Sequence, residues 1–383
     1  MPILSSQRHL FDIPDDIAYF NCAYNSPQLN ASHNRLICGV QSKSHPWERT
    51  GASFFEDAET LRRLSSQIFG GDAEGYAVIP AASYGMSTAA RAIEPHLQPG
   101  DKILVIAEEF PSNVLPWQRT AKETGAVLAT VPTPVHGNWT EAILNACDKA
   151  VKVVAVSPCH WTNGAHIDLR AIGKACRRAG RVLVIDGTQA LGAMPLSIEE
   201  VQPDFLVAAG YKWLLYPYGC GLLYVAKPWR NARPLEETWL ARENAADFTK
   251  LVQYSDTYMP GARRFDVGEK CTATLLPGAI AALEQIKEWG VDNIAKSLAK
   301  INDAIAEHLQ HLGFQMPEKH QRCPHMFGAL LPPKYRGDFI NELKSRKIFI
   351  SQRGNAIRFA PHLHVNDHDI ERLLKAMTEI IVR

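Results

Sequence analysis

The sequence lacks the charge imbalance that marks proteins of nucleic acids and membrane surfaces. Its 41 lysine and arginine residues nearly balance 40 aspartate and glutamate residues, which leaves a formal net charge of +1. Because positive charge is not in excess, neither a nucleic acid nor an anionic membrane is indicated as a partner. A small-molecule ligand is the better expectation.

Paired cysteines and targeting segments are also missing. The eight cysteines are scattered and none forms a CxxC pair, so the sequence indicates neither a disulfide framework nor a zinc site. Residues 1–16 contain no cationic region followed by an apolar one, and no later run is long and apolar enough to span a bilayer. We therefore expect a soluble, cytoplasmic protein with reduced thiols.

Short apolar runs recur between residues 70 and 226. Most are continuous Val, Ile, Leu or Ala, which is typical of strands covered on both faces. Stretches with helical spacing lie between them, several ending at glycine. This alternation predicts an α/β fold. The runs are GYAVIP, KILVIAEE, AVLATVP, KVVAVSP, RVLVIDG, DFLVAAG and CGLLYVA.

A change of pattern suggests a second, smaller domain. Residues 228–262 are aromatic and polar without a clean period, and we interpret them as a loop-rich connection near the ligand. Long helical patterns, short strands and a terminal helix follow, as in a small α+β domain. We predict an N-terminal segment (1–20), a large domain (21–262) and a small domain (263–383), with which the N-terminal segment can also pack.

Several polar or aromatic residues stand where strands end. In an open α/β sheet, ligands collect at the carboxyl ends of strands. Asp186 follows one apolar run directly, and Lys212 follows the next run in surroundings that contain no acid or second base. Taken alone, an aspartate at a strand end usually forms a turn. A lysine among aromatic residues, taken alone, usually reaches solvent. These two interpretations do not explain why Asp186 and Lys212 are accompanied by Phe110 and the AASYG stretch, which stand at two further strand ends.

The motifs resemble those of a known family. Asp186-x-x-Gln189, then Asp204, Gly210-Tyr211-Lys212 and the PYGCG turn are similar to the class V aminotransferases, a branch of the fold-type I pyridoxal phosphate (PLP) enzymes that includes cysteine desulfurases, isopenicillin N epimerase and kynureninase. The likeness extends over residues 109–118, 264–270 and 356–373. It implies a large domain with a seven-stranded, mostly parallel sheet, a small α+β C-terminal domain, and a homodimer with active sites at its interface.

The resemblance assigns the cofactor contacts. Lys212 would hold PLP as a Schiff base and shuttle protons, which requires a neutral amine, and an apolar pocket lowers the pKa of an amine. Asp186 would pair with the pyridine nitrogen, Gln189 would bond the phenolic oxygen, and Phe110 would stack on the ring. The phosphate would be held by residues that open a helix and by one beside the lysine: Ala82, Ser83, Tyr84 and Tyr211.

The substrate contacts follow in the same way. Arg358 would grip the α-carboxylate of an amino acid, because a guanidinium holds a carboxylate in two parallel bonds. Asn21, Ala23 and Tyr24 occupy the first substrate loop of the family. No metal is expected, since the pairs His362-x-His364 and Cys323-x-His325 lack further ligands at suitable spacing.

The type of PLP reaction stays open at this point. Transamination is the first expectation, and the alternatives are a lyase acting at the β-carbon, by kynureninase-like cleavage or C–S elimination, or an epimerase. Cysteine desulfurase activity is disfavoured, because Phe110 replaces a histidine over the ring and the loop ISQRGNAIR carries no cysteine. A PLP-fold binding protein without turnover is the least favoured reading.

Overall fold

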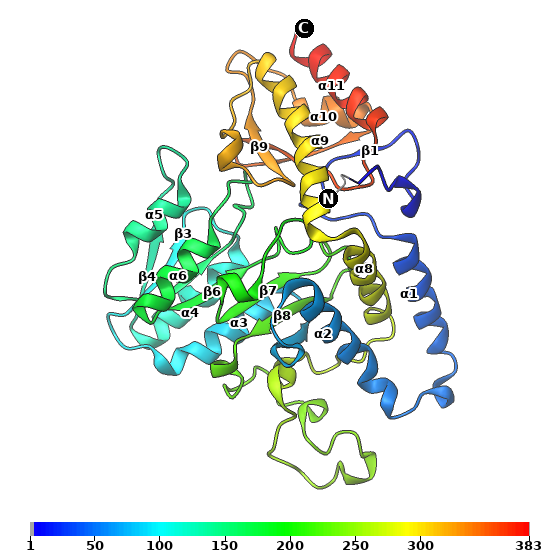
Figure 1. Ribbon diagram of the computed structural model, residues 1–383, viewed down its shortest axis with the longest axis vertical. Coiled ribbons are helices and arrows are strands. Elements are labelled where there is room, and N and C mark those ends of the chain that lie inside the picture. Colours follow the sequence, from blue (N-terminus) through cyan, green and yellow to red (C-terminus); the bar gives the residue numbers. More distant parts are fainter. Residues whose placement is uncertain (1–3, 383) are drawn as a thin grey trace.

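The computed structural model describes residues 4–382, and its centre is a seven-stranded sheet (Figure 1). The strand order is β2-β8-β7-β6-β5-β3-β4, and β8 alone runs antiparallel to its neighbours. The expected α/β fold with a mostly parallel seven-stranded sheet is therefore confirmed. Each of the seven apolar runs forms one strand: β2 (Tyr76–Ile79), β3 (Lys102–Ile106), β4 (Val127–Val131), β5 (Val151–Val156), β6 (Val182–Asp186), β7 (Phe205–Ala209) and β8 (Gly221–Val225).

Helices cover both faces of this sheet, as continuous apolar strands require. Alternate residues of the strands join α3 (Ala82–Ile93) and α4 (Leu115–Thr124) in one core, where Val207 and Met86 are buried. The other residues join a second core with α5 (Trp139–Ala146), α6 (Leu169–Ala179) and α7 (Ile198–Val201). The strands are thus buried on two sides because successive side chains point to opposite faces.

Two helices extend the second core beyond the sheet, and a third, the first helix of the chain, packs against one of them. They are α1 (Asn30–Ser42), α2 (Glu56–Phe69) and α8 (Leu276–Trp289). The packing is close, since a Cβ at Gly278 of α8 would meet Leu36 of α1 at 2.7 Å. Buried residues of α2 and α8, among them Leu61 and Leu283, belong to the same cluster as the strands.

The small domain combines a three-stranded antiparallel sheet with helices on it. Its strand order is β11-β12-β9, formed by Ser351–Arg353, Ala356–Phe359 and Phe327–Leu330. α10 (Phe339–Ser345) and α11 (Asp367–Ile381) complete it. An aromatic core holds these elements together, with the Phe327 and Phe359 rings stacked at 5.3 Å. The expected α+β C-terminal domain is present.

Helix α9 (Val291–His311) joins the two parts (Figure 1). Its first half, with Ile294 and Leu298, packs in the core of the large part, whereas Ile305 and Leu309 pack in the core of the small domain. Since α8 and half of α9 pack with the large part, we propose a division inside α9 rather than at residue 262.

The N-terminal segment pairs with the small domain. Strand β1 (Ala18–Tyr19) lies parallel to β10 (Ile348–Phe349), and Phe20 is buried in the small-domain core. The segment then returns toward the sheet, because the Ser26 hydroxyl donates to the carbonyl of Tyr211 at 3.1 Å. This segment therefore contacts both parts of the molecule.

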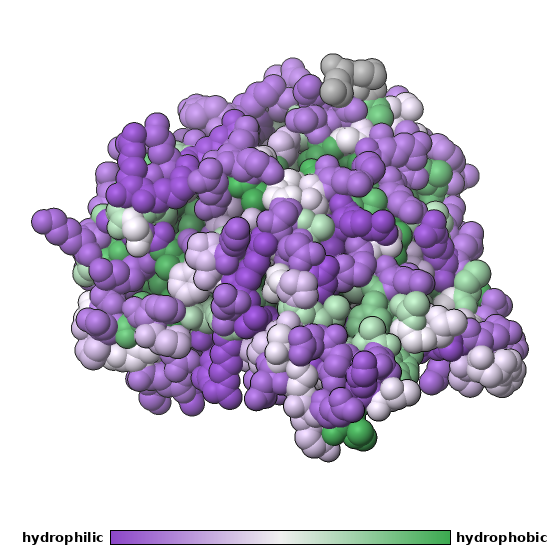
Figure 2. Space-filling model, turned by 60° about the horizontal axis from the view of Figure 1, so that its bottom comes forward, coloured by the Kyte–Doolittle hydropathy of each residue, from purple (hydrophilic) through white to green (hydrophobic). Residues whose placement is uncertain are grey.

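The surface is largely polar. The face in Figure 2 is covered mostly by hydrophilic residues, with hydrophobic ones in smaller groups between them. Among residues 4–382, no helix has the length and apolar character needed to cross a membrane. The connection at 228–262 contains only short 3-10 turns and irregular chain, as its sequence predicted.

Candidate active site

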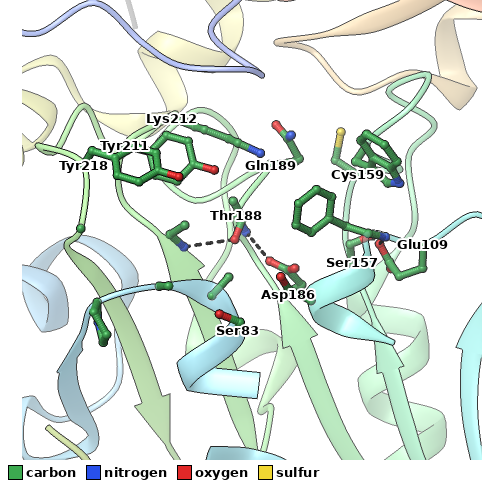
Figure 3. Close-up of a pocket in the computed structure, with 18 residues that line it drawn as sticks. Ser83, Glu109, Ser157, Cys159, Asp186, Thr188, Gln189, Tyr211, Lys212 and Tyr218 are labelled. Atoms are coloured by element: carbon green, nitrogen blue, oxygen red, sulfur yellow. Dashed lines mark hydrogen bonds between the residues drawn. The ribbon is translucent and has the colours of Figure 1, made fainter. Parts of the chain in front are cut away.

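The two residues singled out at neighbouring strand ends line the same cavity. Asp186 is the last residue of β6, and Lys212 follows the end of β7, which lies parallel to β6 with Asp186 opposite Val207. The cavity has a volume of about 210 Å³. Figure 3 shows Lys212 extending across it above Asp186, with Thr188 between them. Sheet topology alone brings this amine and this carboxyl together.

Burial makes the Lys212 amine easy to deprotonate. The side chain is 6% exposed, and burial together with the nearby Arg358 cation lowers its pKa from 10.5 to about 8. Asp186 opposes this shift. The turn that carries the lysine is tight, since a Cβ on Gly210 would meet the Tyr216 ring at 2.2 Å. Lys212 is thus a rigidly placed amine of unusually low basicity.

Asp186 is buried and anchored by the residue two positions on. Burial raises the pKa of its carboxyl, against the effects of Thr188 and Lys212. The Thr188 backbone N–H donates to Asp186 Oδ1 at 2.9 Å, and the Thr188 hydroxyl accepts from the Ala209 N–H at 3.1 Å. These bonds fix the carboxyl relative to the end of β7. A buried acid facing a cavity needs a cationic or hydrogen-bonding partner there.

Two aromatic side chains, Phe110 and Trp161, form a wall of the cavity beside Lys212. Lys212 Nζ lies 5.4 Å from the centroid of the Phe110 ring, and Trp161 meets that ring edge-on at 5.3 Å. The Trp161 Nε1–H donates to the Glu108 carbonyl at 2.6 Å. Glu108 has φ of 54°, a left-handed conformation that a residue other than glycine rarely adopts. Such strained residues are concentrated at functional sites, and Glu108 lies two residues before Phe110.

A second buried carboxyl lies behind this wall. Burial and the nearby Asp186 raise the pKa of Glu109 from 4.5 to about 7. Its oxygens accept from the Phe110 N–H at 2.7 Å and from the hydroxyl of Ser157 at 3.0 Å. Glu109 therefore keeps its proton up to about pH 7, which suits its position beside another acid.

The opposite end of the cavity is formed by the start of α3. Ala82 and Ser83 line it, and the N-cap residue Ala81 provides no side-chain cap, so the first N–H groups of the helix are not satisfied in that way. Tyr84 does not line the cavity. Its N–H donates to the Ala81 carbonyl, and burial and the nearby Glu236 raise the pKa of its phenol. A helix N-terminus open to a cavity favours an anion.

Gln189 and Tyr211 also line this cavity. The Gln189 amide is already engaged, since Nε2 donates to the Ala23 carbonyl at 3.0 Å and Oε1 accepts from Trp213 Nε1 at 2.9 Å. One N–H of the amide remains for a ligand. The Tyr211 ring packs against Tyr218, with centroids 4.4 Å apart. Tyr218 itself is 72% exposed, so it stands at the mouth.

A second cavity of about 250 Å³ adjoins the first and shares Lys212 with it. Tyr24 and Arg358 line it, whereas Asn21 does not. The Nη1 of Arg358 donates to the Trp161 carbonyl at 2.8 Å, but its Nε and Nη2 are buried without a hydrogen-bond partner. A buried guanidinium with two unfilled donors is prepared for an anionic ligand.

Several lining residues were missed by the sequence analysis: Glu109, Ser157, Cys159, Trp161, Thr188, Tyr218 and Arg353. Cys159 bears most directly on function. Although burial raises the pKa of its thiol, Cys323 and His325 outweigh burial and lower it, while the pKa of Cys323 is raised. A thiol of lowered pKa in a cavity is nucleophilic.

A signal for Cys159 was available, since it comes three residues after β5, at a strand end like the others. The histidine pairs named in the sequence analysis do not form a metal site. Within residues 4–382, no three His, Cys, Asp or Glu side chains are arranged to hold a metal ion.

These cavities fit PLP. They combine an amine of low pKa, a buried carboxyl, an aromatic ring beside the amine and an open helix N-terminus. In the same order, these four features would accept four groups of PLP: its aldehyde, its ring nitrogen, its flat ring and its phosphate. Fold and site together are those of an α/β protein whose cavity suits a cofactor that carries an aldehyde and a phosphate.

Comparisons with known proteins agree with this class. The chain matches the profile of the aminotransferase class-V family over residues 40–376, and it belongs to that family. A probable cysteine desulfurase of Pyrococcus abyssi is 24% identical over 394 residues, covering 97% of this chain and 96% of its own length.

Solved structures share the fold. The apo cysteine desulfurase from Thermococcus onnurineus NA1 superposes with a TM-score of 0.86 at 19% identity, and the match covers both chains completely. The cystine C–S lyase C-DES, in complex with its reaction product cysteine persulfide, gives a TM-score of 0.86 at 17% identity over 96% of this chain and 98% of that one.

These findings confirm some expectations and correct others. Membership of the family, the fold, an enzymatic activity and PLP as the cofactor are confirmed. The expectation of transamination is wrong, because the relatives and structural neighbours are consistently cysteine desulfurases. The expectation that cysteine desulfurase activity is disfavoured is wrong for the same reason. The loop before Arg358 contains no cysteine, but the fold places Cys159 in the cavity wall.

Proposed function

We propose that this protein is a PLP-dependent enzyme of the cysteine desulfurase type, which releases the sulfur of an L-cysteine-type amino acid. The observation that carries the proposal is the shared cavity of Lys212 and Asp186. The relatives named as cysteine desulfurases indicate the class of substrate. Cys159 supports it by providing a thiol of lowered pKa in the same cavity.

The residues divide into those that would hold the cofactor and those that would hold the substrate. Lys212 would bind the aldehyde carbon, and Asp186 would keep a proton on the ring nitrogen, because its carboxylate is stabilised by a cation opposite it. Gln189, Phe110 and Tyr211 would fix the ring, and the α3 N-terminus at Ala82 and Ser83 would take the phosphate. Arg358 and Tyr24 lie on the substrate side. We assign no contact with cofactor or substrate to Asn21 and Tyr84, which line neither of these two cavities.

When bound, PLP withdraws electron density from the α-carbon of an amino acid. The protein supplies orientation and proton transfer. Arg358 fixes the carboxylate end of the substrate through its two unfilled donors. The Lys212 amine, with a pKa of about 8, can take and return a proton near neutral pH. Phe110 and Trp161 keep water from one side of the cavity.

We further propose that the enzyme works as a cytoplasmic homodimer with the partner completing the site. Tyr24 and Tyr218 are 59% and 72% exposed at the substrate-side cavity, so their outer faces are free to meet a second copy. Light scattering of the purified protein tests this assembly. A monomer that releases sulfur at full rate would contradict it.

The activity is tested by incubating the PLP-loaded protein with L-cysteine, no keto acid, and a dithiol that takes up the released sulfur atom and sets it free as sulfide while being oxidised to its disulfide. We expect release of sulfide or persulfide together with a sulfur-free product, detected by mass spectrometry. A Lys212→Ala variant should lose both the release and the borohydride-sensitive yellow colour, whereas a variant of an exposed lysine, Lys43→Ala, should keep them. A yellow, correctly folded protein that releases no sulfur from cysteine or its disulfide would refute the proposal.

A further inference from the structure

Cys159 and Cys323 form a pair of buried thiols beside the cofactor cavity. The two residues are 0% and 3% exposed. The Cys323 Sγ donates to the carbonyl of Pro158, the residue before Cys159, at 3.7 Å. Cys159 lines the cavity, and Figure 3 shows its sulfur on the side where Gln189 and the Lys212 amine lie, whereas Cys323 does not line the cavity. Cys159 therefore has the cavity on one side and Cys323 on the side of the protein interior.

Backbone pairing fixes the two thiols relative to each other. Cys159 pairs with His166 in an antiparallel bridge, and the Cys323 N–H donates to the carbonyl of Gly164 at 2.8 Å. The short segment that contains both partners thus bonds one cysteine at each of its edges. A Cβ on Gly164 would meet the Met326 carbonyl at 2.3 Å, so this close arrangement depends on glycine.

A buried histidine beside the pair is able to hold a thiol proton. The His325 Nε2 donates to the carbonyl of Gln189, and Nδ1 is buried with no hydrogen-bond partner among residues 4–382. In this tautomer Nδ1 is an acceptor. Against the effect of burial, Cys323 and His325 lower the pKa of Cys159, because each can hydrogen-bond its sulfur. His325 therefore provides a place for the proton that Cys159 gives up.

The second thiol becomes reactive once the first has bound a sulfur atom. Burial and the nearby Cys159 charge raise the pKa of Cys323, so this thiol stays protonated while Cys159 is a free thiolate. When Cys159 Sγ carries a further sulfur atom, that charge moves to the outer sulfur and part of the restraint is removed. A thiolate that attacks Sγ from the interior side would expel the outer sulfur into the cavity, as in thiol–disulfide exchange.

We propose that Cys159 receives the sulfur of the substrate as a persulfide and that Cys323 then resolves it, releasing the sulfur as hydrogen sulfide. This inference rests on the proposed function for the source of the sulfur. It makes the two cysteines an internal relay, with Cys159 as the acceptor that faces the substrate and Cys323 as the resolving thiol behind it.

The two steps balance as follows. The Cys159 thiolate attacks the substrate sulfur, an S–S bond forms and the Cβ–S bond breaks. The electron pair of that bond stays with the substrate carbon, which is reduced and takes up a proton. Next, the Cys323 sulfur attacks Cys159 Sγ, so that both cysteines are oxidised to one disulfide and the outer sulfur is reduced and leaves with the Cys323 proton. A dithiol then reduces the disulfide and is itself oxidised to a disulfide.

The first test treats the PLP-loaded protein with L-cysteine under argon, without a dithiol, and maps its peptides by mass spectrometry. The wild type should release a single equivalent of sulfide and form a peptide in which Cys159 is linked to Cys323. Cys323→Ser, whose yellow colour shows that it folds, should release none and keep the extra sulfur on Cys159 until a dithiol is added. The matched control is Cys176→Ser, which removes a buried thiol outside the cavity lining and should behave as the wild type.

A second test separates this inference from the proposed function. An inorganic polysulfide places sulfur on a thiolate without any reaction of an amino acid, and it should produce the same linked peptide in the wild type and the same retained persulfide in Cys323→Ser. If it does so but L-cysteine yields neither sulfide nor persulfide, the proposed function fails.

Other outcomes overturn the inference and leave the proposed function standing. One is a persulfide on Cys159 that L-cysteine forms and that persists in the wild type without a link to Cys323. Another is a Cys159→Ser variant that releases sulfide from L-cysteine as the wild type does. Because the linked peptide is measured in the wild type, a variant that fails to fold cannot imitate either result.

Discussion

Lys212 Nζ lies 5.4 Å from the centroid of the Phe110 ring, in the direction from which that ring could stabilise a cation. Burial and the Arg358 charge outweigh this contact and lower the pKa of Lys212 to about 8. The amine therefore changes its protonation near physiological pH instead of near 10.4.

The rate at which the cofactor-free protein attaches PLP should follow this titration. Only the neutral amine reacts with an aldehyde, so the rate should rise about tenfold from pH 7 to pH 9. Stopped-flow absorbance measures it. In Arg358→Gln the midpoint should move to higher pH, because one cation that disfavours protonation is gone. A wild-type midpoint near 10 would show that Lys212 is not desolvated as described.

Glu109 should make the stability of the cofactor-free protein depend on pH. Its pKa is raised from 4.5 to about 7, so between these values the unfolded chain loses this proton while the folded chain keeps it. Stability is present in full below pH 4.5 and is lost as the pH rises to 7, by an amount on the order of 3 kcal/mol.

Urea unfolding at pH 5 and pH 8 measures this loss, which Glu109→Gln should remove. The exposed carboxyl of Glu123 serves as the control, and Glu123→Gln should leave the pH dependence as in the wild type. Equal pH dependence in wild type and Glu109→Gln would contradict the assignment.

The buried ion pairs around Asp266 should be among the most sensitive positions of the fold. Asp266 Oδ2 accepts from Lys270 at 2.8 Å and from Arg62, and Oδ1 accepts from the Val78 N–H at 2.9 Å. Asp266→Asn would leave the buried Lys270 without a counterion and Arg62 with Glu59 alone, which costs about 3–5 kcal/mol of unfolding free energy. Asp247→Asn, at the exposed pair with Lys250, should leave it nearly unchanged. A small effect at Asp266 would mean that water reaches this cluster.

Cys159 should be the most reactive of the buried thiols. Contacts with Cys323 and His325 lower its pKa, whereas burial raises the pKa of Cys220 to about 12. Iodoacetamide at pH 6.5 should therefore label Cys159 at least tenfold faster than Cys220 in the cofactor-free protein.

Peptide mass spectrometry of a Cys38→Ser protein, which lacks the exposed thiol, gives both rates. PLP should protect Cys159, because both occupy one cavity. Labelling of Cys159 and Cys220 at the same rate, or labelling unaffected by PLP, would argue against a thiolate of Cys159 in the cavity lining.

The site residues that could be predicted from the sequence are those that lie at or just after the end of a strand. Asp186 and Lys212 follow continuous apolar runs, and the parallel arrangement of such strands places their ends at one edge. Cys159 obeys the same rule but was not recognised, because the family pattern directed attention to the loop before Arg358.

Other features depended on geometry that a linear sequence does not contain. Tyr84 was expected to contact phosphate with Ser83, but successive residues of a helix point about 100° apart, and its side chain faces Glu236 instead. The position of Arg353 in the cavity lining follows from the register of a hairpin, where a shift by one residue would have turned it away from Arg358. Neither register nor rotation could be read from spacing alone.

The N-terminal segment is bonded at one end to the small domain, through β1 and β10, and at the other to the turn that carries Lys212, through Ser26. Tyr24 lies between these two attachments and borders the substrate-side cavity. A tilt of the small domain would therefore move Tyr24, at the edge of the substrate-side cavity, together with the turn that carries Lys212. Opening of the cavity and movement of the amine would then be coupled.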